Sequence, residues 1–261
     1  MTKENPIEKA AQLIRASIET GTICQPVRDI LGDENIAAGY AVQNYNNSYW
    51  LKAGRRVIGR KLALTAKPVQ EKMGFTSPAY GMLFADMCLA DGAEIDIRNL
   101  IQPKLETEIA VVLKHDLNHA CNTVLDIIHA IDYCLPAFEI ASSRFDWNVK
   151  PSEFVADNAA AAYIVLGSQP KMLSDFNPVR CQMTTALHGK QISSGAGSSC
   201  LFNPLNALVW LADNLAQNGQ PLRAGEVVMT GALGPMIPIS SGDNFDGEIE
   251  GLGSIRISFC S

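Results

Sequence analysis

The sequence has few charged residues, few aromatic residues and no excess of positive charge. Charged side chains make up 18% and aromatic side chains 7% of its 261 residues, and 21 basic against 27 acidic residues give a formal charge of −6. Such a chain lacks the basic surface that binds nucleic acid, and it has no polybasic segment for an anionic membrane. Because 47% of the residues are hydrophobic, we expect a folded core rather than wholesale disorder.

Long hydrophobic runs are also missing. The longest, Ala159 to Leu166, is far shorter than the roughly 20 residues that span a bilayer. The opening segment Met-Thr-Lys-Glu-Asn-Pro has no apolar core like that of a secretion signal. These two features predict a cytoplasmic location.

Paired metal-binding motifs are scarce. None of the seven cysteines forms a Cys-x-x-Cys pair, so reduced thiols are expected and a structural zinc site is not. Among four histidines only His115 and His119 are spaced as His-x-x-x-His, and solvated loop side chains explain them more simply than metal ligation. The glycine-rich segment 195–199 lacks the Lys-Ser/Thr of a phosphate loop, which argues against nucleotide binding.

Helical periodicity and strand-like segments divide the chain into two regions. Apolar residues recur at helical spacing over 5–20 and 34–51, which predicts an N-terminal helical cap of residues 1–55. Residues 56–261 consist mostly of short β segments separated by glycine, which predicts a mixed β catalytic domain and an α+β fold. Within this region we expect helices at 123–131 and 204–219, a hairpin at 181–194, two short strands within 82–97 and irregular structure at 142–157.

Two acids occur close together at the start of a β-branched segment. Glu106 and Glu108 are two residues apart, so a strand places both side chains on one face, with Ala110 and Val112 behind them. Like charges beside apolar packing are costly unless a cation lies between them. The pair therefore predicts part of a site for a hard metal ion.

Two further charged residues are candidates for the same site. Glu139 is isolated in an apolar strand, so it is either the third carboxylate of the metal site or the partner of Arg144 or another basic residue. Lys61 lies in the middle of the strand predicted for residues 56–64. It either faces outward or projects into a lined cavity, where it could transfer protons.

Seven motifs stand in an order typical of one family. They are Gly59-Arg60-Lys61, Leu83-Phe-Ala-Asp-Met87, Glu106-x-Glu108, Leu135-Pro-Ala-Phe-Glu139, Val155-Ala-Asp-Asn158, Asn203-Pro-Leu-Asn206 and Thr230-Gly-Ala-Leu-Gly-Pro-Met236. From about residue 30 onward the chain resembles the 2-keto-4-pentenoate hydratase and 4-oxalocrotonate decarboxylase family of the fumarylacetoacetate hydrolase superfamily. The segment Thr230–Met236 is most similar to the hydratase branch.

The resemblance implies a fold, a metal and a set of site residues. The fold is an N-terminal helical region followed by a mixed β-roll of the fumarylacetoacetate hydrolase C-terminal type, and the protein is a homo-oligomer. The metal is Mg²⁺ or Mn²⁺, and Lys61 is the acid–base residue. The metal ligands are Glu106, Glu108 and Glu139, and the expected substrate contacts are Leu83, Thr230, Gly231 and Ala232. A complex with a pathway partner enzyme stays open.

The implied chemistry is the hydration of 2-hydroxypenta-2,4-dienoate to 4-hydroxy-2-oxopentanoate in aromatic meta-cleavage catabolism. Decarboxylation of 2-oxo-3-hexenedioate is the alternative, because the same metal site supports both reactions. Hydratases of the family usually carry Asp in a lid loop where this chain has Ala79, followed by Tyr80, and an apolar residue there resembles the decarboxylase branch. A hydrolytic relative would need a histidine before His115. A non-catalytic binding protein would not need Lys61.

Overall fold

The computed structural model describes residues 5–261, so the first four residues of the predicted helical cap lie outside the described part. The helices are α1 (Pro6–Thr20), α2 (Arg28–Leu31), α3 (Ile36–Lys52), α4 (Lys67–Lys72), α5 (Val124–Ala130), α6 (Pro151–Ala156) and α7 (Pro204–Gln217). Short 3-10 helices are η1 (Ala85–Met87), η2 (Ile97–Asn99), η3 (Asn158–Ala160), η4 (Leu173–Asp175) and η5 (Gly197–Ser199). In the described residues no helix is long and apolar enough to cross a membrane.

The strands form two sheets. They are β1 (Val57–Ala63), β2 (Ala79–Phe84), β3 (Cys88–Ala90), β4 (Glu94–Asp96), β5 (Lys104–Leu113), β6 (Ile131–Ala141), β7 (Ala161–Leu166), β8 (Gln182–Leu187), β9 (Lys190–Ala196), β10 (Val227–Ala232), β11 (Ile237–Pro238), β12 (Asn244–Ile249) and β13 (Gly253–Cys260). The larger sheet has the order β2-β1-β10-β5-β6-β7-β3, with β11 also paired to β5, and the smaller has the order β4-β13-β12-β8-β9. The predicted α+β class is confirmed.

Helices α1 and α7 begin as their sequences predict. The Asn5 side chain accepts a hydrogen bond from the N–H of Ile7, and the Asn203 side chain accepts one from the N–H of Leu205. A proline follows each asparagine, where its fixed φ suits the first helical turn. Helix α1 ends at Gly21, whose φ of +65° is left-handed.

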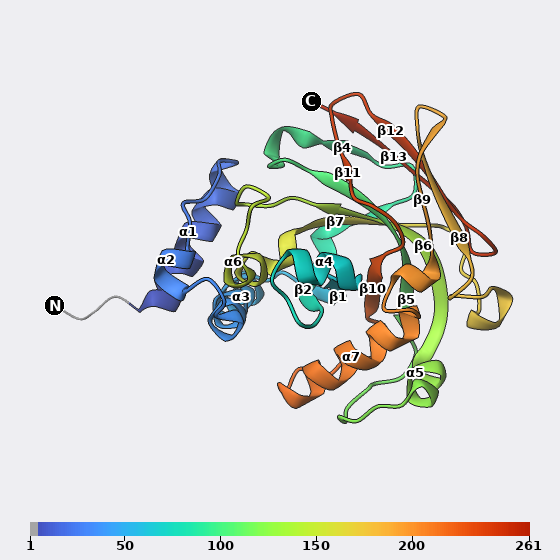
Figure 1. Ribbon diagram of the computed structural model, residues 1–261, viewed down its shortest axis with the longest axis horizontal. Coiled ribbons are helices and arrows are strands. Elements are labelled where there is room, and N and C mark those ends of the chain that lie inside the picture. Colours follow the sequence, from blue (N-terminus) through green and yellow to red (C-terminus); the bar gives the residue numbers. More distant parts are fainter. Residues whose placement is uncertain (1–4) are drawn as a thin grey trace.

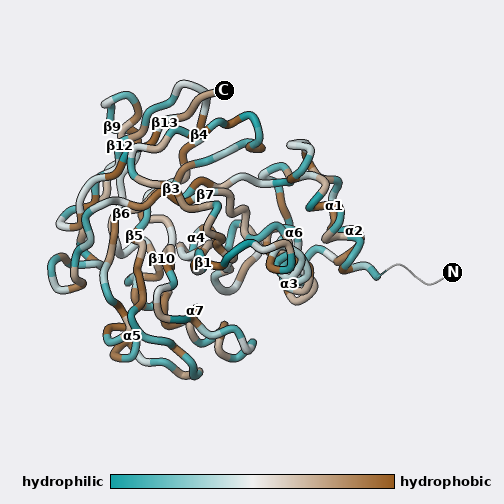
Figure 2. Tube along the Cα trace, turned by 180° about the vertical axis from the view of Figure 1, so that it is seen from behind, coloured by the Kyte–Doolittle hydropathy of each residue, from teal (hydrophilic) through white to brown (hydrophobic). Residues whose placement is uncertain are grey.

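The two sheets pack against each other through apolar side chains of β5, β6, β12 and β13. Leu105 and Phe138 from the larger sheet belong to one buried cluster with Phe245 and Ile257 from the smaller sheet. Helix α7 covers a second part of the larger sheet, and Figure 2 shows hydrophobic stretches along its central strands. In Figure 1, β5 and β6 are strongly bent, while α1, α2 and α3 lie at one side of the molecule. This packing leaves the remaining face of the larger sheet to carry the site.

Helix α3 holds the edge strand β2 in place. The side-chain amide of Gln43 donates hydrogen bonds to the carbonyl oxygens of Tyr80 and Val155, each at 3.0 Å. Gly39 lies so close to α6 that an added Cβ would be 2.6 Å from the carbonyl oxygen of Ser152. The N-terminal helices are therefore packed directly on segments that border the site.

The expectation of irregular structure at 142–157 is wrong for its last part, and the prediction of two short strands within 82–97 is confirmed. The segment 142–157 contains α6, whose Glu153 is buried and accepts hydrogen bonds from the N–H groups of Lys150 and Arg28. The two short strands predicted within 82–97 are present as β3 and β4, which belong to different sheets, since β3 joins β7 and β4 joins β13. In both cases the decisive partners are distant in sequence, so a local pattern does not reveal them.

Candidate metal and proton-transfer site

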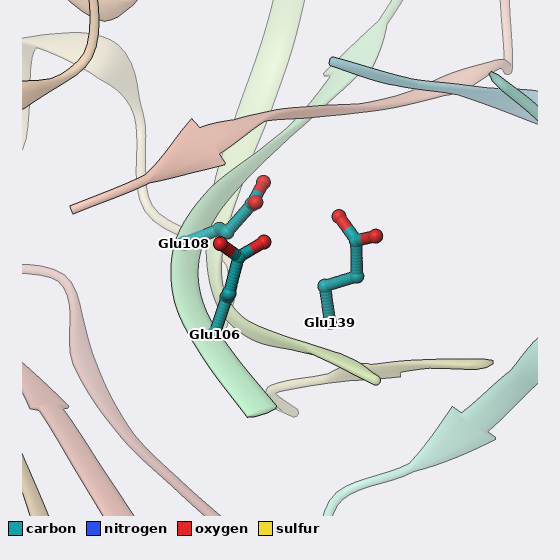
Figure 3. Close-up of side chains that lie close together, drawn as sticks. All are labelled: Glu106, Glu108 and Glu139. Atoms are coloured by element: carbon teal, nitrogen blue, oxygen red, sulfur yellow. The ribbon is translucent and has the colours of Figure 1, made fainter. Parts of the chain in front are cut away.

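The three predicted metal ligands come together on β5 and β6. Glu106 and Glu139 are direct partners in the antiparallel register of these strands, and Glu108 follows on the same face of β5. One carboxylate oxygen of each residue lies within 4.8 Å of the others, and Figure 3 shows the three side chains gathered between the strands. Strand pairing thus brings the isolated acid of one segment to the acidic pair of another.

Burial makes this cluster electrostatically costly. Glu108 and Glu139 are buried and Glu106 is half-buried. Loss of hydration, followed by the charge of Glu139, raises the pKa of Glu106 to about 7. The same two causes raise the pKa of Glu108 well above its ordinary value, and loss of hydration raises that of Glu139. Because Glu106 is the least buried of the three, a ligand has its closest access on that side.

Several carboxylate oxygens of the cluster lack a suitable donor in the described chain. Glu108 Oε1 accepts no hydrogen bond, and neither oxygen of Glu139 accepts a well-directed one, although the Lys61 ammonium is close. Buried polar atoms normally have partners, and a cation satisfies several carboxylate oxygens at once. The donor set consists only of oxygen, which suits a hard divalent ion. The cluster could therefore hold a metal ion.

Lys61 projects into this cluster rather than into solvent. Its side chain is 2% exposed, and its Nζ atom lies 2.6 Å from Glu139 Oε1. The ammonium also donates a hydrogen bond to the carbonyl oxygen of Ala159 at 2.8 Å. The interpretation that Lys61 faces outward is therefore wrong. Glu139 lies among the acids and pairs with a basic residue, Lys61, while its role as a metal ligand stays a prediction.

Strand β2 carries two residues that were assigned to a lid loop. In its register with β1, Gly81 lies opposite Lys61 and Ala79 lies two residues further along. Side chains alternate along a strand, so Ala79 shares the face of Lys61 and Tyr80 points to the other face. There Tyr80 stacks on Tyr40, with ring centroids 4.6 Å apart.

The lid-loop prediction for Ala79 and Tyr80 is thus corrected. Both are buried strand residues, because the loop after α4 ends at Pro78 and their backbones pair with β1. Leu83 lies on the same strand, opposite Gly59, and is also buried. Its contact with substrate stays a prediction.

The segment from Thr230 to Ala232 contacts the cluster through its backbone. The N–H of Gly231 donates a hydrogen bond to Glu108 Oε2 at 2.8 Å, and the Thr230 hydroxyl donates one to the carbonyl of Ile109 at 2.9 Å. The β5–β10 register shifts before Ala232, which pairs with Glu108. Gly231 therefore orients a predicted metal ligand, while substrate contact by these residues stays a prediction.

The sequence alone did not reveal the group that surrounds the Lys61 ammonium. Arg144, considered as a partner of Glu139, instead pairs with the buried Asp157 through its guanidinium and its backbone N–H. Asn158 and Ala159 follow Asp157: the carbonyl of Ala159 accepts a hydrogen bond from Lys61, and the Asn158 side chain bonds the backbone of Met82. The motif Val155-Ala-Asp-Asn158 contained the only signal for this group.

The two histidines with metal-like spacing do not join any site. His115 and His119 are both exposed in the loop after β5. In the part of the chain that the structure describes, the three glutamates form the only group of His, Cys, Asp or Glu side chains close enough to share a metal ion. The interpretation of the histidines as solvated loop residues agrees with these positions.

Comparison with protein families adds an independent finding. The family model for the fumarylacetoacetate (FAA) hydrolase C-terminal domain matches residues 51–259. The chain is 45% identical to the TodF product hydratase of Pseudomonas putida F1 over 97% of its own length and 95% of that protein. It is 44% identical to 2-keto-4-pentenoate hydratase 1 of Dechloromonas aromatica RCB over 97% of its length and 96% of that protein.

Solved structures show the same architecture. The 4-oxalocrotonate decarboxylase from Pseudomonas putida G7, complexed with magnesium and adipate, superimposes with a TM-score of 0.94 at 30% sequence identity. The match covers 99% of this chain and 98% of that one. Fumarylpyruvate hydrolase from Pseudomonas aeruginosa matches with a TM-score of 0.61 at 14% identity, over 78% of this chain and 89% of that one, which shows a shared fold.

Proposed function

The chain belongs to the fumarylacetoacetate hydrolase family, and we propose that it is a metal-dependent hydratase of 2-hydroxypenta-2,4-dienoate. The product is 4-hydroxy-2-oxopentanoate, an intermediate expected in aromatic meta-cleavage catabolism. The observation that carries the proposal is the contact of Lys61 Nζ with Glu139 at 2.6 Å, within the cluster of three acids. This contact joins Lys61, the proposed proton-transfer residue, to Glu139, one of the proposed metal ligands.

The metal of this proposal is Mg²⁺ or Mn²⁺, held by Glu106, Glu108 and Glu139. Their oxygen donors and the unpartnered oxygen of Glu108 support this assignment. When bound, the ion supplies positive charge that stabilises negative charge developing at the 2-oxo oxygen of the substrate. Its presence also offsets the mutual repulsion of the carboxylates.

Lys61 transfers the protons in the proposed reaction. Ketonisation of the dienol removes the 2-hydroxyl proton and delivers a proton to C5, which leaves a C3–C4 double bond conjugated with the 2-oxo group. Water then adds its oxygen at C4, and C3 receives a proton. A buried lysine held by a fixed hydrogen-bond partner can give a proton as the ammonium and, once it is the neutral amine, take one back at a defined position.

Cations beside the acids support an anionic substrate. Lys104 precedes Glu106 by two residues on β5, so strand alternation puts both on one face, at the less buried side of the cluster. Its Nζ atom lies 3.9 Å from the ring centre of Trp147. Lys104 and Lys61 thus flank the acids, and we propose that Lys104 attracts the carboxylate of a 2-oxo acid toward Glu106.

Decarboxylation of 2-oxo-3-hexenedioate is the second candidate, and the observation that favours it is Ala79. This residue shares the face of Lys61 but is buried in an apolar cluster with Leu64 and Phe75. No acid stands there to position the attacking water. We rank hydration first because of the high identity to relatives that are named hydratases.

Assembly with further copies of the chain is part of the proposal. Helix α5 exposes the apolar side chains of Val124, Leu125 and Ile128, which supports burial against a neighbouring subunit. Sedimentation velocity of the purified protein checks this, since a monomer at micromolar concentration contradicts it.

Product analysis separates the candidate reactions. Purified protein with Mg²⁺ is mixed with 2-hydroxypenta-2,4-dienoate, and loss of the dienol absorbance with formation of 4-hydroxy-2-oxopentanoate supports hydration. A parallel reaction with 2-oxo-3-hexenedioate is followed by CO₂ release. Release of CO₂ without turnover of the dienoate would reverse the ranking, and no reaction with either substrate would reject both.

A further inference from the structure

The turn that contacts Lys61 has an unusual backbone. Asn158, Ala159 and Ala160 are consecutive residues with φ values of +52°, +50° and +60°, although none is glycine. A Cβ atom disfavours this left-handed conformation, so three such residues in a row are maintained only if their surroundings impose it. Such strain is often found where a group must be held precisely.

The Asn158 side chain attaches this turn to the edge strand β2. Its Oδ1 atom accepts a hydrogen bond from the N–H of Met82 at 2.7 Å, and its Nδ2 atom donates one to the carbonyl of Met82 at 2.9 Å. The amide thus takes the place of a neighbouring strand at an otherwise unpaired edge. The turn packs so closely that a Cβ on Gly81 would lie 2.4 Å from the carbonyl oxygen of Asn158.

A second anchor lies at the start of the turn. The Arg144 guanidinium pairs with the buried Asp157 carboxylate and donates a hydrogen bond to the Asp157 carbonyl at 2.6 Å. The carbonyl of Ala160 accepts a hydrogen bond from the N–H of Ser142 at 2.8 Å. Both ends of the turn are therefore tied to the segment after β6, the strand that carries Glu139.

The turn acts on Lys61 through one atom. The carbonyl oxygen of Ala159 accepts a hydrogen bond from Lys61 Nζ, and Glu139 contacts the same ammonium from another side. With two of its partners held in place, a flexible four-carbon side chain has a defined end point. The position of the ammonium is thus coupled to the conformation of the turn.

We propose that Asn158 is a positioning residue for Lys61: its two hydrogen bonds to Met82 hold the left-handed turn that places the Ala159 carbonyl on the ammonium. The role in turnover rests on the proposed function, in which Lys61 transfers protons. The structural part, that Asn158 determines where the Lys61 ammonium lies, is independent of the reaction.

The variant Asn158→Gly tests the proposal. Glycine adopts a positive φ freely, so the variant removes the attachment to Met82 without adding backbone strain. His188→Gly is the matched control, because His188 is an exposed residue with φ of +50° in the turn between β8 and β9. We expect Asn158→Gly to lower kcat by about 100-fold, the effect of misplacing a reacting group by about 1 Å. KM and Mg²⁺ affinity change less than threefold, and the control keeps wild-type values.

A measurement without substrate separates this proposal from the proposed function. In protein labelled with ¹⁵N-lysine and loaded with Mg²⁺, the ammonium signal that is missing from Lys61→Met belongs to Lys61. A shifted or broadened signal in Asn158→Gly supports the positioning role, even if the wild type turns over neither substrate. An unchanged signal together with kcat within threefold of wild type overturns it.

The conservative variant Asn158→Asp provides a second test in case Asn158→Gly does not fold. Aspartate keeps the acceptor for the Met82 N–H but cannot donate to the Met82 carbonyl. We expect a smaller loss of kcat and a smaller change in the Lys61 signal than in Asn158→Gly. If Asn158→Gly fails to fold, the aspartate variant alone decides. A folded Asn158→Asp protein with wild-type kcat and an unchanged Lys61 signal then overturns the proposal.

Discussion

 Lys61 on β1 and Glu139 on β6 are 78 positions apart in the sequence, yet Lys61 Nζ lies 2.6 Å from Glu139 Oε1. The 2.6 Å contact between them joins the residue proposed to move protons to one proposed to hold the metal. A change at either residue therefore affects the other.

Replacing Lys61 with Met should stop turnover while the fold is retained. Methionine fills a similar volume but carries no proton, so kcat should fall by at least about 100-fold, the lower range for loss of an acid–base group. Steady-state kinetics and circular dichroism check this. Mg²⁺ should still bind, as measured by calorimetry. Near-normal turnover would show that another group transfers the protons.

Replacing Glu106 or Glu139 with Gln should abolish activity and weaken Mg²⁺ binding by about tenfold or more, because a neutral amide removes a charged ligand. Glu94→Gln is the matched control, since Glu94 is an exposed residue on β4 in the smaller sheet. Calorimetric titration with Mg²⁺ measures the effect. Unchanged affinity in either variant would remove that residue from the metal site.

Mg²⁺ affinity should rise with pH around neutrality. Burial and the charge of Glu139 raise the pKa of Glu106 to about 7, so below that pH the carboxyl holds a proton that the metal must displace. Loss of this proton should therefore increase the affinity by up to about tenfold per pH unit as pH rises toward 7. Titrations between pH 6 and pH 8 check the slope, and a flat profile contradicts it.

Replacing Gly231 with Ala should destabilise the protein and disturb Glu108. Gly231 has φ of +113°, and an added Cβ would lie 2.3 Å from Thr65 Oγ1. We expect a loss of about 1–3 kcal/mol in the free energy of unfolding and weaker Mg²⁺ binding.

Gly242→Ala is the control for this prediction. Gly242 has φ of +87° but no atom within 4 Å of the added Cβ, so it reports backbone strain alone. Urea denaturation and calorimetry compare the two variants. An equal loss of stability in both, with normal Mg²⁺ affinity in Gly231→Ala, would show that the contact with Thr65 is unimportant.

Local patterns in the sequence predicted much of the fold and part of the site. Helical spacing of apolar residues marked α1, and strand alternation put Glu106 and Glu108 on one face. These features depend on residues within one turn or a few strand positions of each other. Local chemistry therefore determines them, and the sequence displays it directly.

Contacts between distant segments could not be predicted in this way. Ala79 and Tyr80 were predicted to lie in a lid loop, but pairing with β1 makes them strand residues. The Arg144–Asp157 pair and the left-handed turn at Asn158 depend on neighbours that only folding supplies.

The sequence by itself determined that two acids share a strand face, that a third acid stands alone in an apolar strand, and that a lysine interrupts another. Only the tertiary structure decided that Glu139 lies opposite Glu106, that Lys61 points at Glu139, and that the carbonyl of Ala159 holds its ammonium. The physical reason is that periodicity is a property of a single segment. Register, burial and the partner of a charge are properties of segments packed together.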